Sequence, residues 1–439
     1  MTPAYQSWGR FPKAKHSPLY LDSRFSDFPD VENERNVLPY GIGRSYGDSC
    51  LNDSNYILPM THLSRFISFD RSSGILMCES GMTFEDIIKY VLPQGWFLPV
   101  TPGTKFITVG GAIANDIHGK NHHCDGTFGH HLLRFELLRS DGQRLLCSRT
   151  QNTPYFHATI GGLGLTGVIT WAEFKLKPVF NSFITQEVVR FRNLDEFFVL
   201  SEESESEYAY TVSWVDCVAK GKGLGRGLFI RGNHASSIMS HVKNLKSGGT
   251  RSVPIDFPGW ALNSLSVKIF NNLYYRKQFK DFKRTTISYD PFFYPLDSIH
   301  HWNRIYGKRG FLQWQCVVPF ADGRDAIQEL LGRIAKSGYG SFLAVLKTFG
   351  KMPAIGMLSF PKEGVTLALD FPMAGPKLFQ LLDELDGIVG NAGGAIYPAK
   401  DARMSSESFQ KFFPRVEEFL QYKDPKFSSS LWRRVHPTK

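Results

Sequence analysis

The stretch PGTKFITVGGAIANDIHGKNHH, residues 102–123, decides which fold this sequence predicts. Its first eighteen residues contain four glycines and two alanines. So little side-chain volume over so long a run indicates that a flat ligand or another stretch of backbone lies against it. We therefore expect residues 102–119 to form one wall of a ligand site.

A second glycine-rich segment, GIGRSYGD at residues 41–48, follows a short apolar strand. Its glycines allow backbone conformations in which successive N–H groups approach an anion closely. Arg44 and the hydroxyl of Ser45 add charge-assisted hydrogen bonds of the kind that hold a diphosphate. A tight turn with an exposed arginine is the alternative, and residues 102–119 shift the balance toward the anion site.

A third cluster, GGLGLTG at residues 161–167, formally contains the G-x-G-x-x-G pattern of dinucleotide-binding helices. That pattern requires a helix to follow, whose N-terminus binds the diphosphate. Residues 168–176 instead alternate in side-chain character and begin with β-branched residues, so they predict a strand. A P-loop is excluded as well, because Ala114 stands where its first glycine is needed.

Histidines concentrate around the first stretch, which raises the question of a metal site. His118, His122, His123, His130 and His131 lie among glycines and polar residues, without a cysteine pair or an H-E-x-x-H pattern. Metal sites need convergent ligands on a rigid element. We therefore expect no metal, and interpret these histidines as hydrogen-bonding groups near a polar ligand.

Composition sets broader limits. The 439 residues suit two domains, and 42% hydrophobic with 21% charged residues is typical of a folded globular chain. The net charge of +10 favours anionic partners. We find no apolar run of about 18 residues and no secretory signal. The six cysteines contain no C-x-x-C pair, which favours reduced thiols in a cytoplasmic protein.

The order of predicted elements indicates an α+β protein of two domains. Residues 34–180 alternate short strands with glycine clusters and include one well-marked helix that starts after Thr83. Longer strand-like runs follow, at 209–215, 310–318 and 341–347, and a helical stretch is predicted at 406–422. We expect domains at 1–180 and 181–392, with 393–439 completing the first.

These glycine-rich segments resemble the FAD-binding domain of the vanillyl-alcohol-oxidase (p-cresol methylhydroxylase) superfamily. The run DIHGKNHH, residues 116–123, is the most specific signal, because generic flavin binding does not require it. It resembles the family of decaprenylphosphoryl-β-D-ribose 2′-oxidases, over nearly the whole chain. Further agreement comes from GFLQWQ at 310–315, FLAVLK at 342–347, LDFP at 369–372 and YPAKD at 397–401.

The resemblance implies a fold of two parts, an FAD-binding domain of the p-cresol methylhydroxylase type and an antiparallel-sheet substrate domain. It also implies that residues 39–49 wrap the FAD diphosphate. The implied FAD contacts are Gly41, Gly43, Arg44, Ser45, Tyr46, Gly47, Asp48, Ser49, Gly103, Thr108, Val109, Gly110, Gly111, Asn115, Asp116, Ile117, His118, Ile169 and Tyr397. Many relatives bond FAD covalently through a histidine where this chain has Arg44. We therefore expect non-covalent FAD.

The resemblance further implies oxidation of the 2′-hydroxyl of a polyprenylphosphoryl-β-D-ribofuranose to the 2′-keto sugar, the first step toward an arabinose donor for the cell envelope. An NAD(P)H-dependent short-chain dehydrogenase would be the partner that reduces the ketone. FAD-dependent oxidation of another sugar or an aldonolactone is the alternative. A membrane-bound flavoprotein without catalysis is a third, which the joint presence of Tyr46, His118, Lys347 and Lys400 disfavours.

Flavin chemistry leaves the protein to orient the sugar and handle a proton. The catalytic candidates are Lys400, His118 and Tyr46, with Lys400 favoured and the proton acceptor open between Lys400 and His118. The substrate-binding candidates are Gln313, Gln315, Lys347 and Lys400. The two glutamines lie on one side of a strand through their i, i+2 spacing. Many family members have a cysteine where this chain has Ala368, so nitroaromatic inhibitors that attach there should form no adduct.

Residues 260–284 interleave aromatic side chains with lysines and arginines. This combination suits the surface of an anionic bilayer, where a polyprenyl-phosphate substrate would lie. A surface helix with one buried face is the alternative reading. Nucleic acid is not expected, because no nucleic-acid-binding module accompanies the basic residues. The sequence thus predicts a cytoplasmic protein with peripheral contact to the inner membrane.

Overall fold

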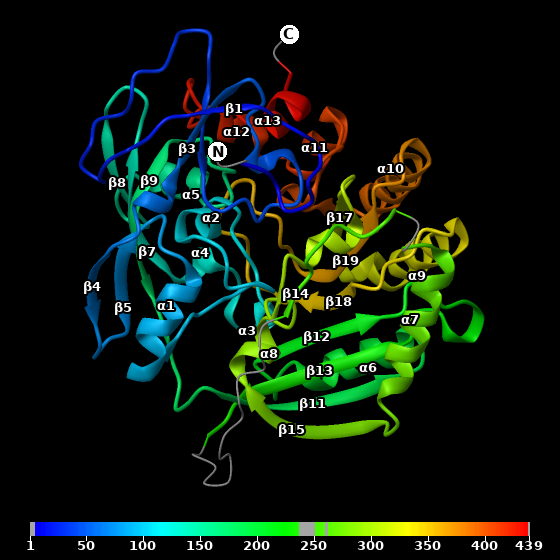
Figure 1. Cartoon of the computed structure of the whole chain (residues 1–439). Coiled ribbons are helices and arrows are strands. Elements are labelled where there is room, and N and C mark those ends of the chain that lie inside the picture. The colour runs from blue at the N-terminus through cyan, green and yellow to red at the C-terminus, as the bar shows by residue number, and fades with distance from the viewer. Residues whose placement is uncertain (1–4, 237–250, 260–261, 438–439) are drawn as a thin grey trace.

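The computed structural model describes residues 5–236, 251–259 and 262–437. Two large β-sheets organise it, a five-stranded sheet within residues 66–175 and an eight-stranded sheet within residues 183–396. Figure 1 shows the smaller sheet on the left and the larger one at the lower right, with the red C-terminal helices beside the blue N-terminal strands. Helices and antiparallel sheets together give the α+β class that the sequence predicts.

The five-stranded sheet is antiparallel throughout. Its spatial order is β4 (Phe66–Asp70), β5 (Ile75–Glu79), β9 (Val168–Lys175), β7 (Leu132–Leu138) and β8 (Arg144–Ser148). The strand β9 directly follows the cluster at 161–167, and its burial alternates in part along its length. The prediction that a strand and not a diphosphate-binding helix follows this cluster is therefore confirmed.

Helix α1 (Phe84–Val91) packs against this sheet and forms for the reasons read from its sequence. The Thr83 side chain accepts a hydrogen bond from the Asp86 backbone N–H, and Glu85 and Asp86 place negative charge at the helix N-terminus. Four apolar side chains of α1 are buried in the core. The 3-10 helix η3 (Leu92–Gln94) follows α1 directly, and the chain leaves it through Gly95, which has a φ of 85°.

Smaller elements carry the glycine-rich segments. A parallel sheet of β1 (His16–Pro18), β3 (Asn55–Pro59) and β2 (Val37–Tyr40) ends immediately before residues 41–48. The stretch 102–123 supplies the short helix α2 (Val109–Ala114). The remaining short elements here are α3 (His122–Asp125), α4 (Phe128–His131), α5 (Thr153–Thr159) and the paired strands β6 (Trp96–Phe97) and β10 (Lys177–Pro178).

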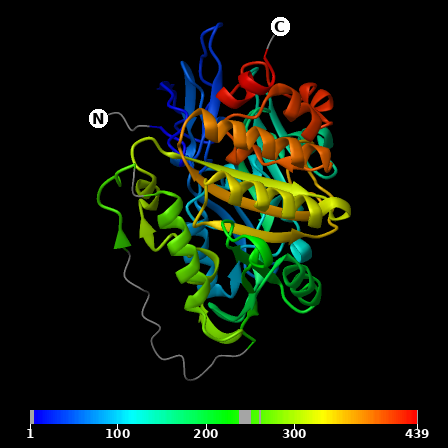
Figure 2. The same cartoon turned by 90° about the vertical axis from the view of Figure 1, so that its right-hand side faces the viewer.

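The eight-stranded sheet is antiparallel at every pairing. Its spatial order is β15 (Phe282–Ser288), β11 (Phe183–Phe191), β13 (Gly227–His234), β12 (Tyr210–Val215), β18 (Ala344–Phe349), β19 (Gly364–Pro372), β17 (Phe311–Val318) and β20 (Ala395–Ile396). Helices α9 (Phe320–Ser337) and α10 (Pro376–Asn391) lie side by side next to its strands (Figure 2). The other elements in this part are α6 (Leu194–Ser204), α7 (Ser264–Lys277), α8 (Tyr289–Phe293), β14 (Arg251–Ser252) and β16 (Ile299–His300).

Two expected elements differ from the structure. The strand expected at 341–347 begins at Ala344, because the Ser341 hydroxyl and the Leu343 backbone hydrogen-bond each other in a local turn. The helix expected at 406–422 is two helices, α11 (Ser406–Phe412) and α12 (Val416–Leu420). Pro414 separates them, since proline has no N–H and restricts the residue before it.

The C-terminal segment contacts both sheets. Strand β20 pairs with β17, and the 3-10 helix η6 (Pro398–Lys400) follows it at once. The last helix, α13 (Ser430–Val435), packs on the 3-10 helix η1 (Asp48–Cys50), and the Ser430 N–H donates to the Leu51 carbonyl. The domain boundaries at 180 and 392 remain a prediction.

Candidate active site

The loop at residues 41–48 is held against the C-terminal segment. The Tyr46 N–H donates to the Ala399 carbonyl at 2.9 Å. A side chain at Gly47 would overlap the carbonyl oxygen of Asp401, so only glycine allows this approach. This contact places Tyr46 beside Lys400, whose Nζ lies 5.7 Å from the centre of the Tyr46 ring.

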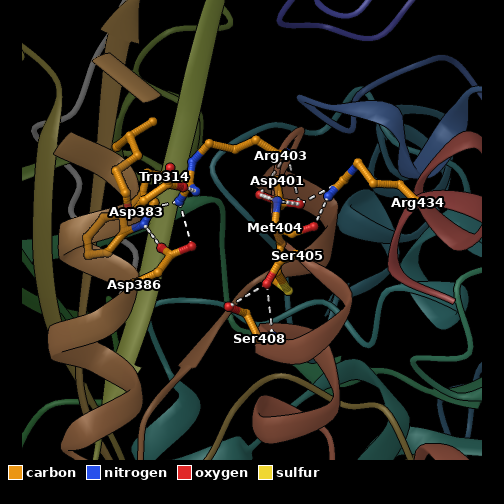
Figure 3. Close-up of polar contacts among 10 residues, drawn as sticks. Trp314, Asp383, Asp386, Asp401, Arg403, Met404, Ser405, Ser408 and Arg434 are labelled. Atoms are coloured by element: carbon orange, nitrogen blue, oxygen red, sulfur yellow. Dashed lines mark hydrogen bonds and ion pairs between the residues drawn. The ribbon is translucent and has the colours of Figure 1, made fainter. Parts of the chain in front are cut away.

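Arg434 of α13 joins the two sides of this contact. Its guanidinium donates to both carboxylate oxygens of Asp48, at 3.0 and 2.7 Å, and to Asp401 at 2.9 Å. Figure 3 shows Arg434 extended toward Asp401, with Arg403 reaching the other way to Asp386. Asp386 also accepts from the Trp314 indole N–H at 2.8 Å. We call Asp48, Asp401, Arg403, Arg434 and Asp386 the clamp.

Arg44 lies on an aromatic surface next to this loop. Its guanidinium carbon is 4.0 Å from the centre of the Trp8 ring and 5.3 Å from that of Phe106. Burial lowers the pKa of Arg44. Arg44 Nε and the Ser49 hydroxyl are buried without a hydrogen-bond partner in the described part of the chain.

A cavity of about 570 Å³ opens beside Gly41. Its lining residues are Tyr5, Tyr20, Leu21, Asp22, Gly41, Pro59, Thr61 and His62. A side chain at Gly41 would approach the Thr108 hydroxyl to 2.6 Å, so the first loop and the second stretch touch here. Thr108 itself caps α2 and accepts from the Gly111 N–H at 3.2 Å.

The polar side chains that follow α2 form hydrogen bonds with other residues of the chain. Asp116 is fully buried and accepts from the Ser359 hydroxyl at 2.6 Å and the Gly129 N–H at 3.0 Å. Burial raises its pKa, while these hydrogen bonds act in the opposite direction. The Asn115 amide donates to the Gly111 carbonyl at 2.9 Å. These contacts set the path of the chain into His118.

His118 meets the eight-stranded sheet. Its Nε2 lies 3.1 Å from the Gln315 amide nitrogen, and its Nδ1 is buried without a partner in the described residues. Its ring contacts Phe349 and Tyr397 at 4.9 and 5.2 Å between centres. Burial, with the nearby Lys347 and Lys400, holds its pKa well below the ordinary histidine value. His118 is therefore neutral near pH 7.

Two lysines, Lys347 and Lys400, lie near this histidine, and Lys120 lies near Lys347. Lys347 donates to the Gly119 carbonyl at 2.7 Å, and Lys120 donates to the Phe292 carbonyl. Burial lowers the pKa of Lys120 to about 7 and that of Lys400 to about 8. Burial, with the charges of Lys400 and Lys120, also holds the pKa of Lys347 well below its usual value. Each of the three lysines is partly buried and has a pKa below its usual value.

Gln313 and Gln315 do lie on the same side of β17, as their spacing predicts. Gln315 is 2% exposed and donates to the Thr366 hydroxyl as well as facing His118. Gln313 donates to Asp370, its cross-strand partner on β19, at 2.5 Å. The side-chain oxygens of both glutamines are buried without partners in the part of the chain described.

The structure thus brings together Tyr46, His118, Gln313, Gln315, Lys347 and Lys400. Other predicted positions contribute backbone or packing. Val109, Ile117 and Ile169 are buried in the core around the five-stranded sheet, and the Tyr397 hydroxyl donates to the Asn115 carbonyl at 2.9 Å. The Gly110 N–H donates to the Ser80 carbonyl, and Gly103 has no atom within 4 Å of a built side chain.

Three residues of the site had no role assigned from sequence. Asp370 stood in a quoted motif, and Lys120 in the most specific run, so a signal was present for both. Arg434 had none, because its partner Asp48 is 386 residues away. Among the described residues, no group of three or more His, Cys, Asp or Glu side chains is arranged to hold a metal ion.

The sequence of this chain is similar to a known family model and to several known proteins. A family model described as FAD binding domain matches residues 31–148. The decaprenylphosphoryl-beta-D-ribose oxidase of Mycolicibacterium smegmatis is 35% identical over 417 residues, 92% of this chain and 90% of that protein. The uncharacterized protein in mprA 5′region of Streptomyces coelicolor is 32% identical over 81% of this chain and 100% of its own length. The Delta(24)-sterol reductase of Homo sapiens is 29% identical over 27% of this chain and 23% of its own.

Proposed function

This chain belongs to the decaprenylphosphoryl-β-D-ribose oxidase family of FAD-dependent oxidoreductases. We therefore propose that it oxidises the 2′-hydroxyl of a polyprenylphosphoryl-β-D-ribofuranose to the 2′-keto sugar. One observation carries the choice of substrate. Two partly buried lysines, Lys347 and Lys400, a neutral histidine and two glutamine oxygens without partners in the described residues lie at one site. Cations suit the phosphate, and the uncharged groups suit sugar hydroxyls.

The residues of the first domain fit an FAD molecule. Arg44 Nε and the hydroxyls of Ser49 and Ser80 are buried polar groups without partners in the described residues, so they could bind a diphosphate. The open surface at Gly103 and the cavity beside Gly41 offer room for the dinucleotide. We propose that the FAD is held without a covalent bond, since a guanidinium at Arg44 cannot form one.

Acid precipitation tests this mode of attachment. The yellow colour should pass into the supernatant when the holoprotein is precipitated with acid. A yellow pellet would show a covalent link.

When bound, FAD supplies the hydride acceptor. The protein must then bind the phosphate, orient the ribose and accept the proton of the hydroxyl group. Lys120 and Lys347 are well placed to hold the phosphate, because an incoming anion offsets the cost of their burial. The Gln313 and Gln315 oxygens are free to accept hydrogen bonds from sugar hydroxyls.

We propose Lys400 as the proton acceptor and His118 as the group that orients the ring. Burial brings the pKa of Lys400 to about 8, so a useful fraction of the amine is neutral near pH 7. His118 stays neutral, and its Nε2 accepts a hydrogen bond from the Gln315 amide. Tyr46 packs beside Lys400, and burial raises its pKa so that it keeps its proton.

Anaerobic titration with a short-chain polyprenylphosphoryl ribose tests the proposed function. The flavin absorbance should bleach on mixing, and the product should carry one ketone. An aldonolactone and a nucleotide-linked sugar serve as matched competitors. Bleaching by a competitor but not by the ribosyl phosphate would overturn the substrate assignment and favour the alternative.

The chemistry of the product indicates the partner. A 2′-ketone has lost the configuration of its carbon, so a reductase can return hydride to the other face. We therefore propose an NAD(P)H-dependent short-chain dehydrogenase as the partner that consumes this product.

The lipid tail of such a substrate points to a membrane surface. Among the described residues, no helix combines the length and apolar character needed to cross a bilayer. We propose that α7 and the start of β15 provide peripheral contact with the inner membrane. Leu265, Ile269 and Leu273 are spaced four residues apart along α7 and are 52–66% exposed, whereas Val267 faces the core. Trp260, which began this segment in the sequence prediction, lies outside the described residues.

Charge on this surface favours an anionic bilayer. Helix α7 contains no acidic residue, and its cations are exposed together with those that follow it. These cations are Lys268, Arg276, Lys277, Lys280, Lys283 and Arg284. Phe279, in the same stretch, is 90% exposed. Apolar and cationic side chains on one face match the interface of an anionic membrane.

Vesicle sedimentation tests this contact. The protein should sediment with phosphatidylglycerol vesicles more than with phosphatidylcholine vesicles, and less as salt rises. The double variant Ile269→Glu, Leu273→Glu should lose binding, whereas Phe180→Ser, which changes a phenylalanine that is 83% exposed elsewhere, should keep it. Equal binding by all three proteins would overturn the assignment. So would a dimer that α7 substitutions dissociate.

A further inference from the structure

We propose that Asp370 is a positioning residue of the candidate active site, which orients the Gln313 side chain and places a negative charge near Lys400. The inference rests on the proposed function, since it deepens the chemistry of that site. Asp370 is 1% exposed and lies on β19, where the antiparallel register pairs it with Gln313 of β17. The pairing brings a carboxylate into a site that otherwise holds cations.

Both carboxylate oxygens of Asp370 are engaged. The Gln313 amide donates to Oδ1 at 2.5 Å, and the Tyr306 hydroxyl donates to Oδ2 at 3.3 Å. Tyr306, from the 3-10 helix η5 (Trp302–Tyr306), is itself buried and stacks on Phe311 with ring centres 4.2 Å apart. The carboxylate is therefore fixed by two donors from different elements.

This arrangement decides which end of Gln313 faces the ligand. A carboxylate accepts hydrogen bonds and does not donate, so Gln313 must turn its NH₂ group toward Asp370. Its oxygen is left buried and without a partner in the described residues. Gln313 thus offers an acceptor to a substrate hydroxyl, and an amide at position 370 would remove the constraint that orients it.

Asp370 also supplies the opposite charge that acts on Lys400. Burial lowers the pKa of Lys400 to about 8, and the carboxylate opposes that fall. Burial raises the pKa of Asp370 to about 6, which Gln313, Lys400 and Tyr306 oppose. The other titratable groups around the pair are Tyr46, Tyr306, His118 and Lys347. Burial raises the pKa of both tyrosines, so they stay protonated, and holds the pKa values of His118 and Lys347 well below their usual values. Removing the carboxylate should therefore release the Lys400 proton at a lower pH.

Competitive acetylation of the holoprotein with acetic anhydride across pH tests this assignment without any substrate. The midpoint for Lys400, followed by mass spectrometry, should fall by about one pH unit or more in Asp370→Asn. Asp386→Asn is the matched control, because Asp386 is also a buried acid but pairs with Arg403 and Trp314. Its Lys400 midpoint should equal that of the native protein.

A functional arm follows the same variants by anaerobic flavin reduction with the short-chain ribosyl phosphate. In Asp370→Asn, the pH at which the rate of flavin reduction rises should fall by the same amount as the acetylation midpoint. The KM for the ribosyl phosphate should rise. Should Asp370→Asn fail to fold with FAD, Tyr306→Phe removes one donor to the carboxylate and should shift the midpoint in the same direction. An unchanged Lys400 midpoint in a folded variant overturns the proposal. Absence of flavin reduction in the native protein would instead count against the proposed substrate.

Discussion

The clamp and the reactive face of this molecule use buried polar groups in opposite ways. In the clamp, Asp48, Asp401 and Asp386 each have arginine partners at 2.5–3.0 Å. In the reactive face, which comprises His118, Gln313, Gln315, Lys347 and Lys400, three polar atoms are buried without partners in the described residues. Satisfied groups fix a shape, whereas unsatisfied ones are available to a ligand. Substitutions in the two regions should therefore fail in different ways.

The largest expected effect is on chemistry, at Lys400. Lys400→Met should lower the rate of flavin reduction by about 10²–10⁴-fold, because a positioned base contributes that much. Stopped-flow absorbance under anaerobic conditions measures this rate. FAD content and thermal stability should stay close to native.

Lys362→Met is the control for that loss. Burial also lowers the pKa of Lys362, which donates to the Gly393 carbonyl outside the reactive face. Its rate should be native. A comparable loss in both variants would show that the effect comes from removing any partly buried amine.

The next effect is on stability, at the clamp. Arg434→Met leaves Asp48 and Asp401 without their shared cation and should lower the free energy of unfolding by about 3 kcal/mol. Urea denaturation of the holoprotein measures it. The variant should also release FAD at lower urea, whereas its Lys400 acetylation midpoint should be native. A stable variant that retains FAD would separate the clamp from cofactor binding.

Alanine substitutions at Gly47 and Gly103 should also differ, because one position contacts the protein backbone and the other does not. Gly47→Ala should cost about 1–3 kcal/mol of stability through overlap with the Asp401 carbonyl. Gly103→Ala meets no atom within 4 Å and should leave the apoprotein as stable as native. If Gly103 lines the FAD, its alanine variant should nevertheless bind FAD more weakly in a fluorescence titration. Native affinity would remove Gly103 from the cofactor surface.

The smallest effect is a pH slope set by Asp370. Its pKa rises from 3.8 to about 6 on folding, so between those values the folded protein holds a proton that the unfolded chain has released. This group therefore stabilises the fold fully below about pH 4 and loses that contribution as pH rises through 6. The slope is at most about 1.4 kcal/mol per pH unit. Urea denaturation at pH 4.5 and 6.5 should show a smaller decline in Asp370→Asn than in the native protein.

Local signals predicted much of this structure. The cap at Thr83, the strand after residue 167 and the shared side of Gln313 and Gln315 follow from short-range patterns, and all three are present. Pro414 carried a signal too, although the sequence prediction ran a helix through it. The role of each predicted site residue stays a proposal.

Long-range partners could not be predicted in the same way. The bond between Asp48 and Arg434 spans 386 residues, and neither residue type reveals the other. Asp370 gains its neighbours only through the register of β17 and β19, because a slip of one residue would turn its side chain to the other face. Long-range pairing and strand register depend on the tertiary structure, so short-range sequence patterns do not predict them.

The junction of Gly47 with Asp401 has a consequence for biosynthesis. The loop that would receive the flavin diphosphate comes early in translation. The Asp401 backbone that it contacts is made about 350 residues later, and the Arg434 guanidinium that binds Asp48 is made 386 residues after that carboxylate. A ribosome still elongating through the second sheet therefore carries an unfinished nucleotide pocket. Flavin uptake should accordingly be a late event, after residue 434 has emerged, and nascent chains stalled earlier should remain colourless.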